Sequence, residues 1–120
     1  MANQGNERAE LAIDVFCYRI KKYIGAYAAV LDTVDALIFT GGIGENAASL
    51  RGRICDRLTQ IGIRVDPKAN EAALAKEVEI STSDSKVRVF VIPTNEQAAI
   101  AKDAYEIARL ERRDPVCAYV

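Results

Sequence analysis

The sequence predicts a small α/β fold in which a narrow, mostly parallel sheet is flanked by helices. Two apolar runs rich in β-forming residues, 35–40 and 87–92, each end in a turn that a helical pattern follows. Most of the remaining chain has apolar residues at intervals of three and four, which is the spacing of amphipathic helices. Strands that alternate with helices in this way are typical of a layered α/β architecture.

The N-terminal part of the chain predicts a long helix and then a strand. Residues 7–31 form the helix, whose apolar face comprises Ala12, Phe16, Ile20, Tyr23, Ile24, Tyr27 and Leu31. The strand at 35–40 contains an apolar run without polar alternation, Ala36-Leu37-Ile38-Phe39. Such a run indicates an interior strand that is covered on both faces.

The middle of the chain predicts two further helices and weak strands. The first helix has Asn46 as its N-cap, ends near Gly62 and buries Ala47, Leu50, Ile54, Leu58 and Ile61. Asp66 and Pro67 then read as the N-cap and first residue of a short helix over 68–76. We expect short strands at 63–65 and around Val78 and Ile80.

The strand at 87–92 is the strongest in the chain, because nearly all of its residues favour β-structure. Pro93 ends it. Thr94 then opens the last helix, with Gln97 three residues later as the partner in a capping box. We expect the inner face of this helix to comprise Ala99, Ile100, Ala104, Ile107 and Ala108.

Composition excludes several classes of function. The 120 residues carry a net charge of −1, which gives no electrostatic footprint for nucleic acid. No apolar run reaches the roughly 20 residues of a membrane helix, and the polar N-terminus lacks a signal-peptide core, so we expect a cytoplasmic protein. Histidine is absent and the 3 cysteines form no CxxC pair, which argues against zinc and against histidine-dependent nucleophiles.

The first motif that could carry chemistry is Gly41-Gly42-Ile43-Gly44-Glu45-Asn46, directly after the first strand. It is neither a P-loop nor a Rossmann fingerprint, because the lysine and the glycine spacing of those motifs are missing. One interpretation is a tight turn that needs glycine for its geometry, with Asn46 as a helix cap. The other is a loop whose backbone passes close to a nucleoside, with Glu45 or Asn46 hydrogen-bonding a base or ribose.

The second motif is Pro93-Thr94-Asn95-Glu96, directly after the second strong strand. It has a structural interpretation, in which Thr94 caps the helix and Glu96 complements the helix dipole. In the functional interpretation, Glu96 reaches a Mg²⁺ ion directly or through water. If the two strands are parallel neighbours, both motifs lie at one edge of the sheet, where open α/β sheets bind ligands.

Together these segments resemble the C-terminal part of the acetokinase family. The resemblance rests on residues 18–27, 35–46 and 91–96, and it extends from about residue 7 to residue 109. It implies part of an RNase-H-like fold of the actin, hexokinase and Hsp70 superfamily. It further implies transfer of the γ-phosphoryl group of ATP to acetate, often also to propionate, with Mg²⁺.

The resemblance also assigns roles to individual residues. It implies that Gly42, Ile43, Gly44, Glu45 and Asn46 line the adenosine pocket and that Glu96 serves the magnesium ion. It assigns no residue of this chain to the bond-making step. The chain resembles only the final quarter of family members, so the cationic groups that hold the transferring phosphoryl group lie outside it. We therefore expect the chain to be inactive alone.

The resemblance divides the chain into a disordered lead at 1–6, the C-terminal acetokinase portion at 7–110 and a frayed tail at 111–120. The missing part of the fold would leave sheet edges exposed, and such edges pair with other chains. We expect a homodimer, with the helix face over 16–31 as its surface, or association with a complementary fragment. Two alternatives remain: a nucleotide-binding or subunit-association module without chemistry, and a structural remnant without ligand.

Overall fold

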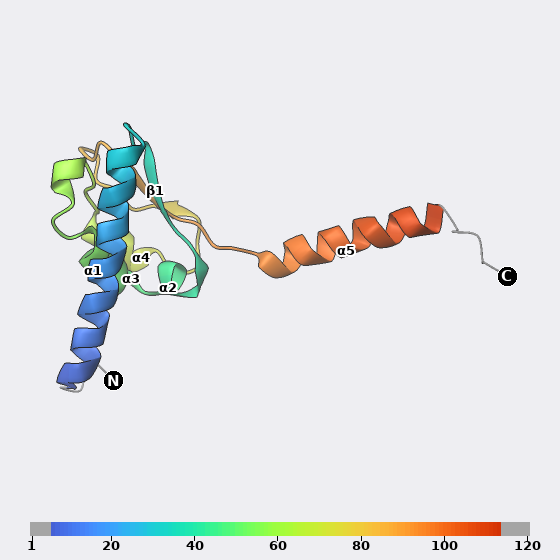
Figure 1. The fold of residues 1–120 in the computed structure, drawn as a ribbon, viewed down its shortest axis with the longest axis horizontal. Coiled ribbons are helices and arrows are strands. Elements are labelled where there is room, and N and C mark those ends of the chain that lie inside the picture. Colours follow the sequence, from blue (N-terminus) through green and yellow to red (C-terminus); the bar gives the residue numbers. More distant parts are fainter. Residues whose placement is uncertain (1–5, 114–120) are drawn as a thin grey trace.

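The structure is a computed structural model that describes residues 6–113 (Figure 1). It opens with helix α1, Glu7–Val30, which confirms the long helix expected at 7–31. The side chain of Asn6 caps this helix by accepting from the N–H groups of Arg8 and Ala9, both at 3.2 Å. Residues 1–5 of the lead expected at 1–6, and residues 114–120 of the tail expected at 111–120, lie outside the described residues. No described helix combines the length and apolar character needed to span a membrane.

Three strands form one mixed sheet in the order β1-β3-β2. Strand β1, Ala36–Phe39, runs parallel to β3, Arg88–Val91, with Ala36 opposite Arg88 and Phe39 opposite Val91. Strand β2, Val78–Glu79, pairs antiparallel on the other side of β3. The expected parallel pairing of the two strong strands is confirmed. Residues 63–65 contribute only isolated bridges, from Ile63 to Val87 and from Val65 to Ser81.

Strand β1 departs from its prediction, because it lies at the edge of the sheet and only one of its faces is covered. Phe39 is buried, whereas Ile38 is 52% exposed. Ile38 lies beside its register partner Phe90 on the open face, which the described helices leave uncovered. The apolar run predicted cover on both faces, and the described residues cover only the face that carries Phe39.

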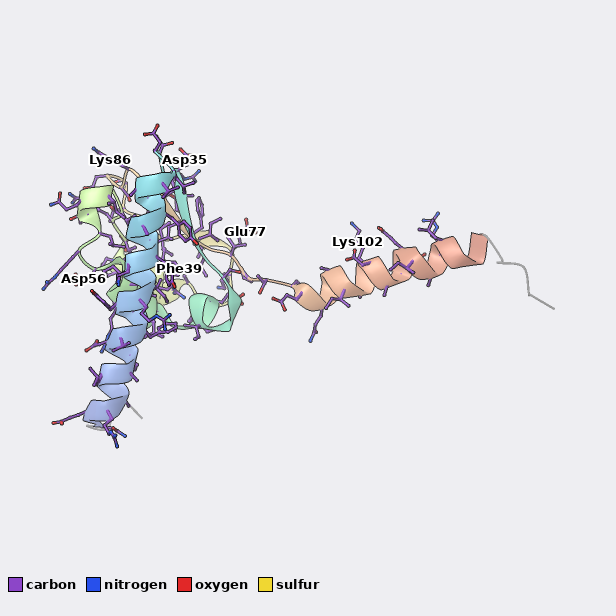
Figure 2. The ribbon with its side chains drawn as sticks, viewed as in Figure 1. Asp35, Phe39, Asp56, Glu77, Lys86 and Lys102 are labelled. Atoms are coloured by element: carbon purple, nitrogen blue, oxygen red, sulfur yellow. The ribbon has the colours of Figure 1, made fainter. Side chains whose placement is uncertain are left out.

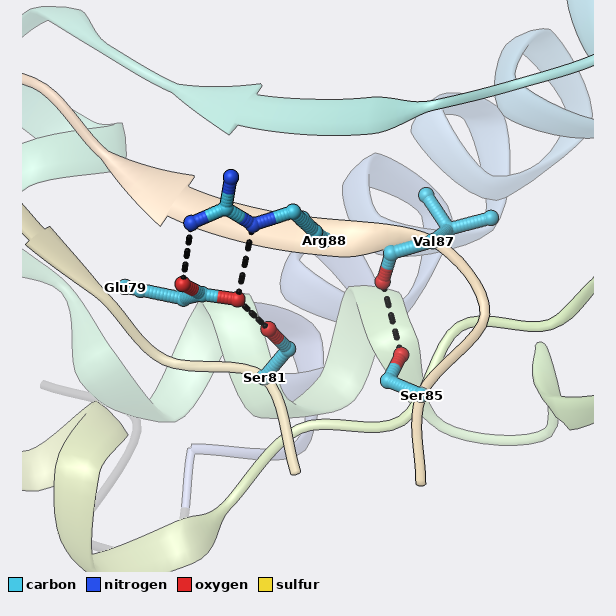
Figure 3. Close-up of polar contacts among 5 residues, drawn as sticks. All are labelled: Glu79, Ser81, Ser85, Val87 and Arg88. Atoms are coloured by element: carbon cyan, nitrogen blue, oxygen red, sulfur yellow. Dashed lines mark hydrogen bonds and ion pairs between the residues drawn. The ribbon is translucent and has the colours of Figure 1, made fainter. Parts of the chain in front are cut away.

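The open face of the sheet also carries an ion pair between β2 and β3 (Figure 3). Arg88 donates from Nη2 to Glu79 Oε2 at 2.7 Å and from Nε to Glu79 Oε1 at 3.2 Å. Ser81 donates its hydroxyl to the same carboxylate at 2.6 Å. The guanidinium also lies over the Phe90 ring, 4.7 Å from its centre. These contacts tie the short β2 to the centre of the sheet.

The helix expected after the glycine motif is divided into shorter pieces. The motif itself forms a one-turn helix, α2, Gly41–Asn46, and α3 follows at Ala48–Cys55. Asn46 is therefore not an N-cap, and its side-chain amide donates to the Gly42 carbonyl at 3.0 Å. A 3₁₀ turn, Thr59–Ile61, precedes Gly62, whose φ of +88° ends the segment in the left-handed region.

The short helix α4, Pro67–Ala72, begins as the sequence predicts. Asp66 caps it by accepting from the Ala69 N–H at 2.9 Å, and Pro67 occupies the first turn. Helix α1 packs on α3, where Arg53 donates to Glu10 at 2.9 Å and to Asp14 at 3.1 Å. The buried apolar core between the helices and the covered face of the sheet comprises Cys17, Phe39, Ile54, Cys55, Leu58, Ile63, Ala73, Ile80, Val87, Val89 and Val91.

The last helix, α5, Glu96–Arg113, extends away from the rest of the chain (Figure 1). Figure 2 shows side chains, Lys102 among them, projecting from it without a neighbouring element. The helix is confirmed, but its expected inner face is wrong for this chain. Ile100 is 68% exposed and Ile107 is 58% exposed. Helical periodicity is a local property, and no described residue packs against this stripe.

Candidate functional site

The two motifs meet at one edge of the sheet, because β1 and β3 are parallel and both end there. Glu45 of the first motif joins them. Its Oε1 accepts from the Thr94 N–H at 2.8 Å and from the Thr94 hydroxyl at 3.1 Å. Two segments that are 49 residues apart in sequence are thereby closed against one another.

The hydrogen bonds at Glu45 favour its charged form. The N–H of Thr94 lowers the pKa of the Glu45 carboxyl most, and the Thr94 hydroxyl and the Gly41 N–H lower it further, against a smaller opposing effect of desolvation. Glu45 is therefore a carboxylate at neutral pH. One of its oxygens is already used to hold the two loops together, which is a structural role that the sequence interpretation did not include.

The glycines of α2 have different reasons to be glycine. Gly41 has a φ of +70°, a conformation that other residues adopt at a cost. A Cβ on Gly44 would lie 3.1 Å from the carbonyl carbon of Phe39, so Gly44 allows β1 and α2 to approach one another. A Cβ on Gly42 would meet nothing within 4 Å. Gly42 thus has open space beside it, as Gly41 does, but without the positive φ of Gly41.

The other predicted residues of the loop lie on the same short helix. The apolar side chain of Ile43 is 53% exposed next to Gly42. Asn46 is exposed, and its amide nitrogen is used within the turn, as described above. The structure therefore brings Gly42, Ile43, Gly44, Glu45 and Asn46 together at the edge of the sheet.

The loop is held from behind by Arg51, which the sequence interpretation did not identify. This side chain is 1% exposed. Its Nη1 donates to the carbonyls of Gly44 and Glu45, at 2.8 and 3.0 Å. Nε donates to the side-chain oxygen of Asn70 at 2.8 Å, and Nη2 donates to the carbonyls of Asn70 and Ala73, each at 2.7 Å. Desolvation lowers the pKa of Arg51, which still remains protonated at neutral pH.

A sequence signal for Arg51 did exist. Arg51 precedes Ile54 by three residues, Cys55 by four and Leu58 by seven, so it lies on the buried stripe of α3. A charged residue on such a stripe needs buried partners. Its partner Asn70 is buried at 6% exposure and donates to the Ala48 carbonyl at 2.8 Å.

Glu96, the predicted magnesium residue, is the first residue of α5 and is exposed at the same edge of the sheet. Thr94 is not the cap of this helix, and its N–H and hydroxyl donate to Glu45. Asn95 takes that role by accepting from the Ala98 N–H at 3.0 Å. The T-x-x-Q pattern predicted the start of the helix to within two residues but assigned the wrong cap.

The oxygen groups at this edge could coordinate magnesium only together with the phosphates of a bound ligand. Within residues 6–113, no cluster of three or more acidic, cysteine or histidine side chains could hold a metal ion. Magnesium commonly takes one or two protein carboxylates and completes its coordination with phosphate and water. The single exposed carboxylate of Glu96 fits that pattern.

A cavity of about 760 Å³ that is lined in part by α3 and α4 lies elsewhere and includes none of residues 41–46.

Comparison with known proteins gives a consistent family. The sequence model of the Acetokinase family matches residues 1–102. The acetate kinase of Methanosarcina thermophila is 54% identical over 110 residues, which is 92% of this chain and 27% of that protein. The acetate kinase of Halothermothrix orenii is 52% identical over 106 residues, 88% of this chain and 26% of the relative.

Solved structures agree with the sequence comparison. The crystal structure of Porphyromonas gingivalis acetate kinase superposes with a TM-score of 0.80 at 48% identity, covering 89% of this chain and 27% of that one. A propionate kinase from Francisella tularensis subsp. tularensis SCHU S4 gives a TM-score of 0.74 at 39% identity, covering 83% and 25%. The chain thus spans about a quarter of the length of the relatives that it matches.

Proposed function

Because the chain belongs to the acetokinase family, we propose that it supplies the adenosine-binding loop and a magnesium-contacting glutamate for the ATP-dependent phosphorylation of acetate or propionate. The reaction would take place in the cytoplasm. The alternative is a nucleotide-binding or subunit-association module that performs no chemistry. The kinase proposal and the nucleotide-binding alternative share the same nucleotide site. They differ in whether residues that match the other three quarters of the relatives take part with it in catalysis.

The observation that carries the proposal is the closure of the two motifs by Glu45 and Thr94. A nucleotide needs an adenosine surface and a place for its phosphates with their metal. The proposal puts adenosine against α2 and the phosphates toward Glu96. The shared edge of the sheet supports this assignment, since ligands of open α/β sheets bind outside the carboxyl ends of the strands.

The roles of the individual residues follow from their surroundings. Gly42 has open space beside it and would let an adenosine ring approach the backbone. Ile43 offers an exposed apolar side chain to that ring. Asn46 and the second oxygen of Glu45 would hydrogen-bond the base or ribose. Gly44 serves the protein's own packing against Phe39 and contacts no ligand in this proposal.

Glu96 would hold Mg²⁺ directly or through water, and the ion would neutralise charge on the nucleotide phosphates. The residues of this chain bind and orient the nucleotide and its metal. Phosphoryl transfer depends on positioning and on cationic groups around the transferring phosphoryl, and no residue in 41–46 or 93–96 is cationic. We therefore expect no acyl phosphate from this chain alone.

The experiment titrates the 120-residue chain with ADP and Mg²⁺ by calorimetry and compares Gly42→Val with Gly25→Val. Gly25 lies on α1, and a Cβ there would also meet nothing within 4 Å, so it controls for the substitution itself. We expect binding by the parent chain and by Gly25→Val, and loss of binding in Gly42→Val. Equal affinity in the two variants would refute the loop assignment. Formation of acetyl phosphate from ATP and acetate by the chain alone would refute the expectation of inactivity.

We further propose that α1 pairs with a second copy of the chain. Helix α1 presents Tyr23 and Tyr27 at 56% and 62% exposure and Phe16 at 38%, and Leu31, which caps the helix, is 58% exposed. Ile20 and Ile24 of the same helix pack on the core instead. A second copy could cover the exposed aromatic residues, because contiguous apolar surface on a protein marks an interaction site. A complementary fragment of a longer relative is the other candidate partner.

A further inference from the structure

Four consecutive carbonyl groups of α2, those of residues 42–45, accept hydrogen bonds from within the protein. The Gly42 carbonyl accepts from the side chain of Asn46, and the Ile43 carbonyl accepts from the Ala47 N–H at 3.0 Å. The carbonyls of Gly44 and Glu45 belong to the last turn, where a helix lacks partners of its own. Arg51 provides both partners.

We propose that Arg51 is a positioning residue of the nucleotide site, which sets the shape of the loop 41–46 by holding two of its carbonyls inward and linking them to α4. This inference rests on the proposed function, because it treats that loop as the adenosine surface. Arg51 contacts no ligand in this proposal. It acts through the backbone of residues 44 and 45.

The geometry of the guanidinium supports this role. A planar group with donors in a fixed fork can serve several acceptors from different segments at once, whereas a lysine ammonium cannot match that arrangement. Here the donors reach the end of α2, the side chain and carbonyl of Asn70, and the carbonyl of Ala73. One buried side chain therefore fixes the loop relative to a second helix.

The partners of Arg51 also separate this role from that of an ordinary ion pair. Arg51 donates all five hydrogen bonds to carbonyl oxygens. Four of these oxygens belong to the backbone, and the fifth belongs to the side-chain amide of Asn70. No carboxylate forms a salt bridge with Arg51 among the described residues. Burying a charge is costly without such compensation. The arrangement orders the main chain, and the part of the main chain that it orders includes the proposed site.

A positioning role and a charge role make different predictions for the ligand. If Arg51 acted through its positive charge on the phosphates, Arg51→Lys, which keeps that charge, would leave ADP binding nearly unchanged. If it sets the shape of the adenosine surface, both ligands lose affinity by the same factor. We expect the second outcome.

The test uses Arg51→Lys in the 120-residue chain, with Arg53→Lys as the matched control. Arg53 lies on the same helix but bonds the carboxylates of Glu10 and Asp14, so it has no contact with the loop. We expect Arg51→Lys to lose about tenfold in affinity for adenosine and for ADP with Mg²⁺, as the loss of one charged hydrogen bond or more predicts. Arg53→Lys should bind both as the parent chain does. Unchanged affinity in Arg51→Lys, or a loss confined to ADP, overturns the inference.

A second measurement does not need a ligand. The Ala47 N–H bonds the Ile43 carbonyl at the end of the loop, so its hydrogen exchange reports on the shape that Arg51 maintains. We expect faster exchange of Ala47 in Arg51→Lys and not in Arg53→Lys. The Ile80 N–H, bonded to the Val89 carbonyl in the sheet, should be unchanged in both. An unchanged rate of Ala47 amide exchange in Arg51→Lys overturns the inference, whatever the measured affinity for nucleotide.

These two measurements distinguish the possible failures. If the parent chain binds no nucleotide, the proposed function fails, and Ala47 exchange still decides whether Arg51 shapes the loop. If Arg51→Lys does not fold, Asn70→Ala takes its place, because it removes the partner of Nε, together with the donor to the Ala48 carbonyl, and leaves the loop carbonyls intact. We expect Asn70→Ala to accelerate Ala47 exchange, and an unaltered rate there counts against the inference.

Discussion

The carboxylate of Glu45 accepts two hydrogen bonds from Thr94, one from its N–H at 2.8 Å and one from its hydroxyl at 3.1 Å. This contact closes the turn after β1 against the turn after β3. The contact links a residue of the first motif, Glu45, to a residue of the second, Thr94. Whether Glu45 is charged therefore affects how the proposed nucleotide and magnesium positions are held relative to one another.

We expect the Glu45 contact to weaken in acid. The folded-state pKa of Glu45 is lowered mainly by the Thr94 N–H. Its contribution is therefore complete above the unfolded glutamate pKa of about 4.3 and is lost as pH falls through the lower folded value. NMR titration of the side chain should give a pKa below the ordinary glutamate value of about 4.3, and Thr94→Ala should raise it. A Glu45 pKa at or above the ordinary glutamate value would contradict the contact.

Gly44→Ala should destabilise the protein, whereas Gly42→Ala should not. The new methyl at residue 44 would lie 3.1 Å from the backbone of Phe39, and the same methyl at residue 42 would meet open space. We expect about 1–3 kcal/mol of lost unfolding free energy at Gly44, a typical cost of overpacking. At Gly42 we expect no loss, since alanine favours a helix over glycine by about 1 kcal/mol. Urea denaturation of both variants checks this, and equal stabilities would contradict it.

The Glu79–Arg88 pair on the open face should be visible in the titration of Glu79 (Figure 3). Hydrogen bonds from Arg88, which has the larger effect, and from Ser81 together lower the pKa of Glu79 to about 2. Arg88→Ala should return that pKa toward about 4.3. Any stability that the pair contributes is present above that unfolded value and is lost as pH falls toward 2. Because the pair is exposed, we expect little change in unfolding free energy at pH 7. A Glu79 pKa that Arg88→Ala leaves unchanged would contradict the pairing.

Cys17 and Cys55 should resist alkylation in the folded protein. Both thiols are buried, and desolvation raises the pKa of each, to about 12 for Cys55. The thiolate is the reactive species, so little of it is present at pH 8. Mass spectrometry after iodoacetamide treatment should find these two residues labelled only once urea has unfolded the chain. Rapid labelling of Cys55 without urea would show that α3 does not pack as described.

Tyr27→Lys should weaken self-association if α1 forms the interface between copies. Tyr27 is 62% exposed on α1, so the substitution places a charge on the proposed interface without removing core packing. Light scattering coupled to size-exclusion chromatography should show a shift from dimer toward monomer. Lys102→Glu on α5 is the control and should leave the dimer intact. A parent chain that is monomeric at high concentration would rule out this interface.

Local patterns predicted much of the fold. The long helix α1, the strands β1 and β3, and the start of α4 at Pro67 all follow from periodicity, β-propensity and capping chemistry within a few residues. The parallel pairing of β1 with β3 also followed, because strand-turn-helix units in succession favour it. That pairing brought the two motifs to one edge, as expected from the sequence.

Contacts between distant residues decided the rest. Thr94 has the residue type of a helix cap, yet Asn95 caps α5, and the Thr94 hydroxyl donates to Glu45, far away in sequence. Asn46 also caps nothing, but for a local reason, because its side chain donates to the Gly42 carbonyl within α2. A cap is a competition among nearby acceptors, and tertiary partners alter its outcome without altering the local sequence.

The sequence by itself determined the kinds of elements, their order and the edge at which both motifs lie. Only the tertiary structure decided that Arg51 holds the loop from behind, that Ile38 lies on an open face and that the apolar stripe of α5 has no partner in this stretch of chain. The reason is physical: a helix or strand forms from interactions among neighbours in sequence. Burial and hydrogen bonding of a given side chain depend instead on which distant segment folds against it.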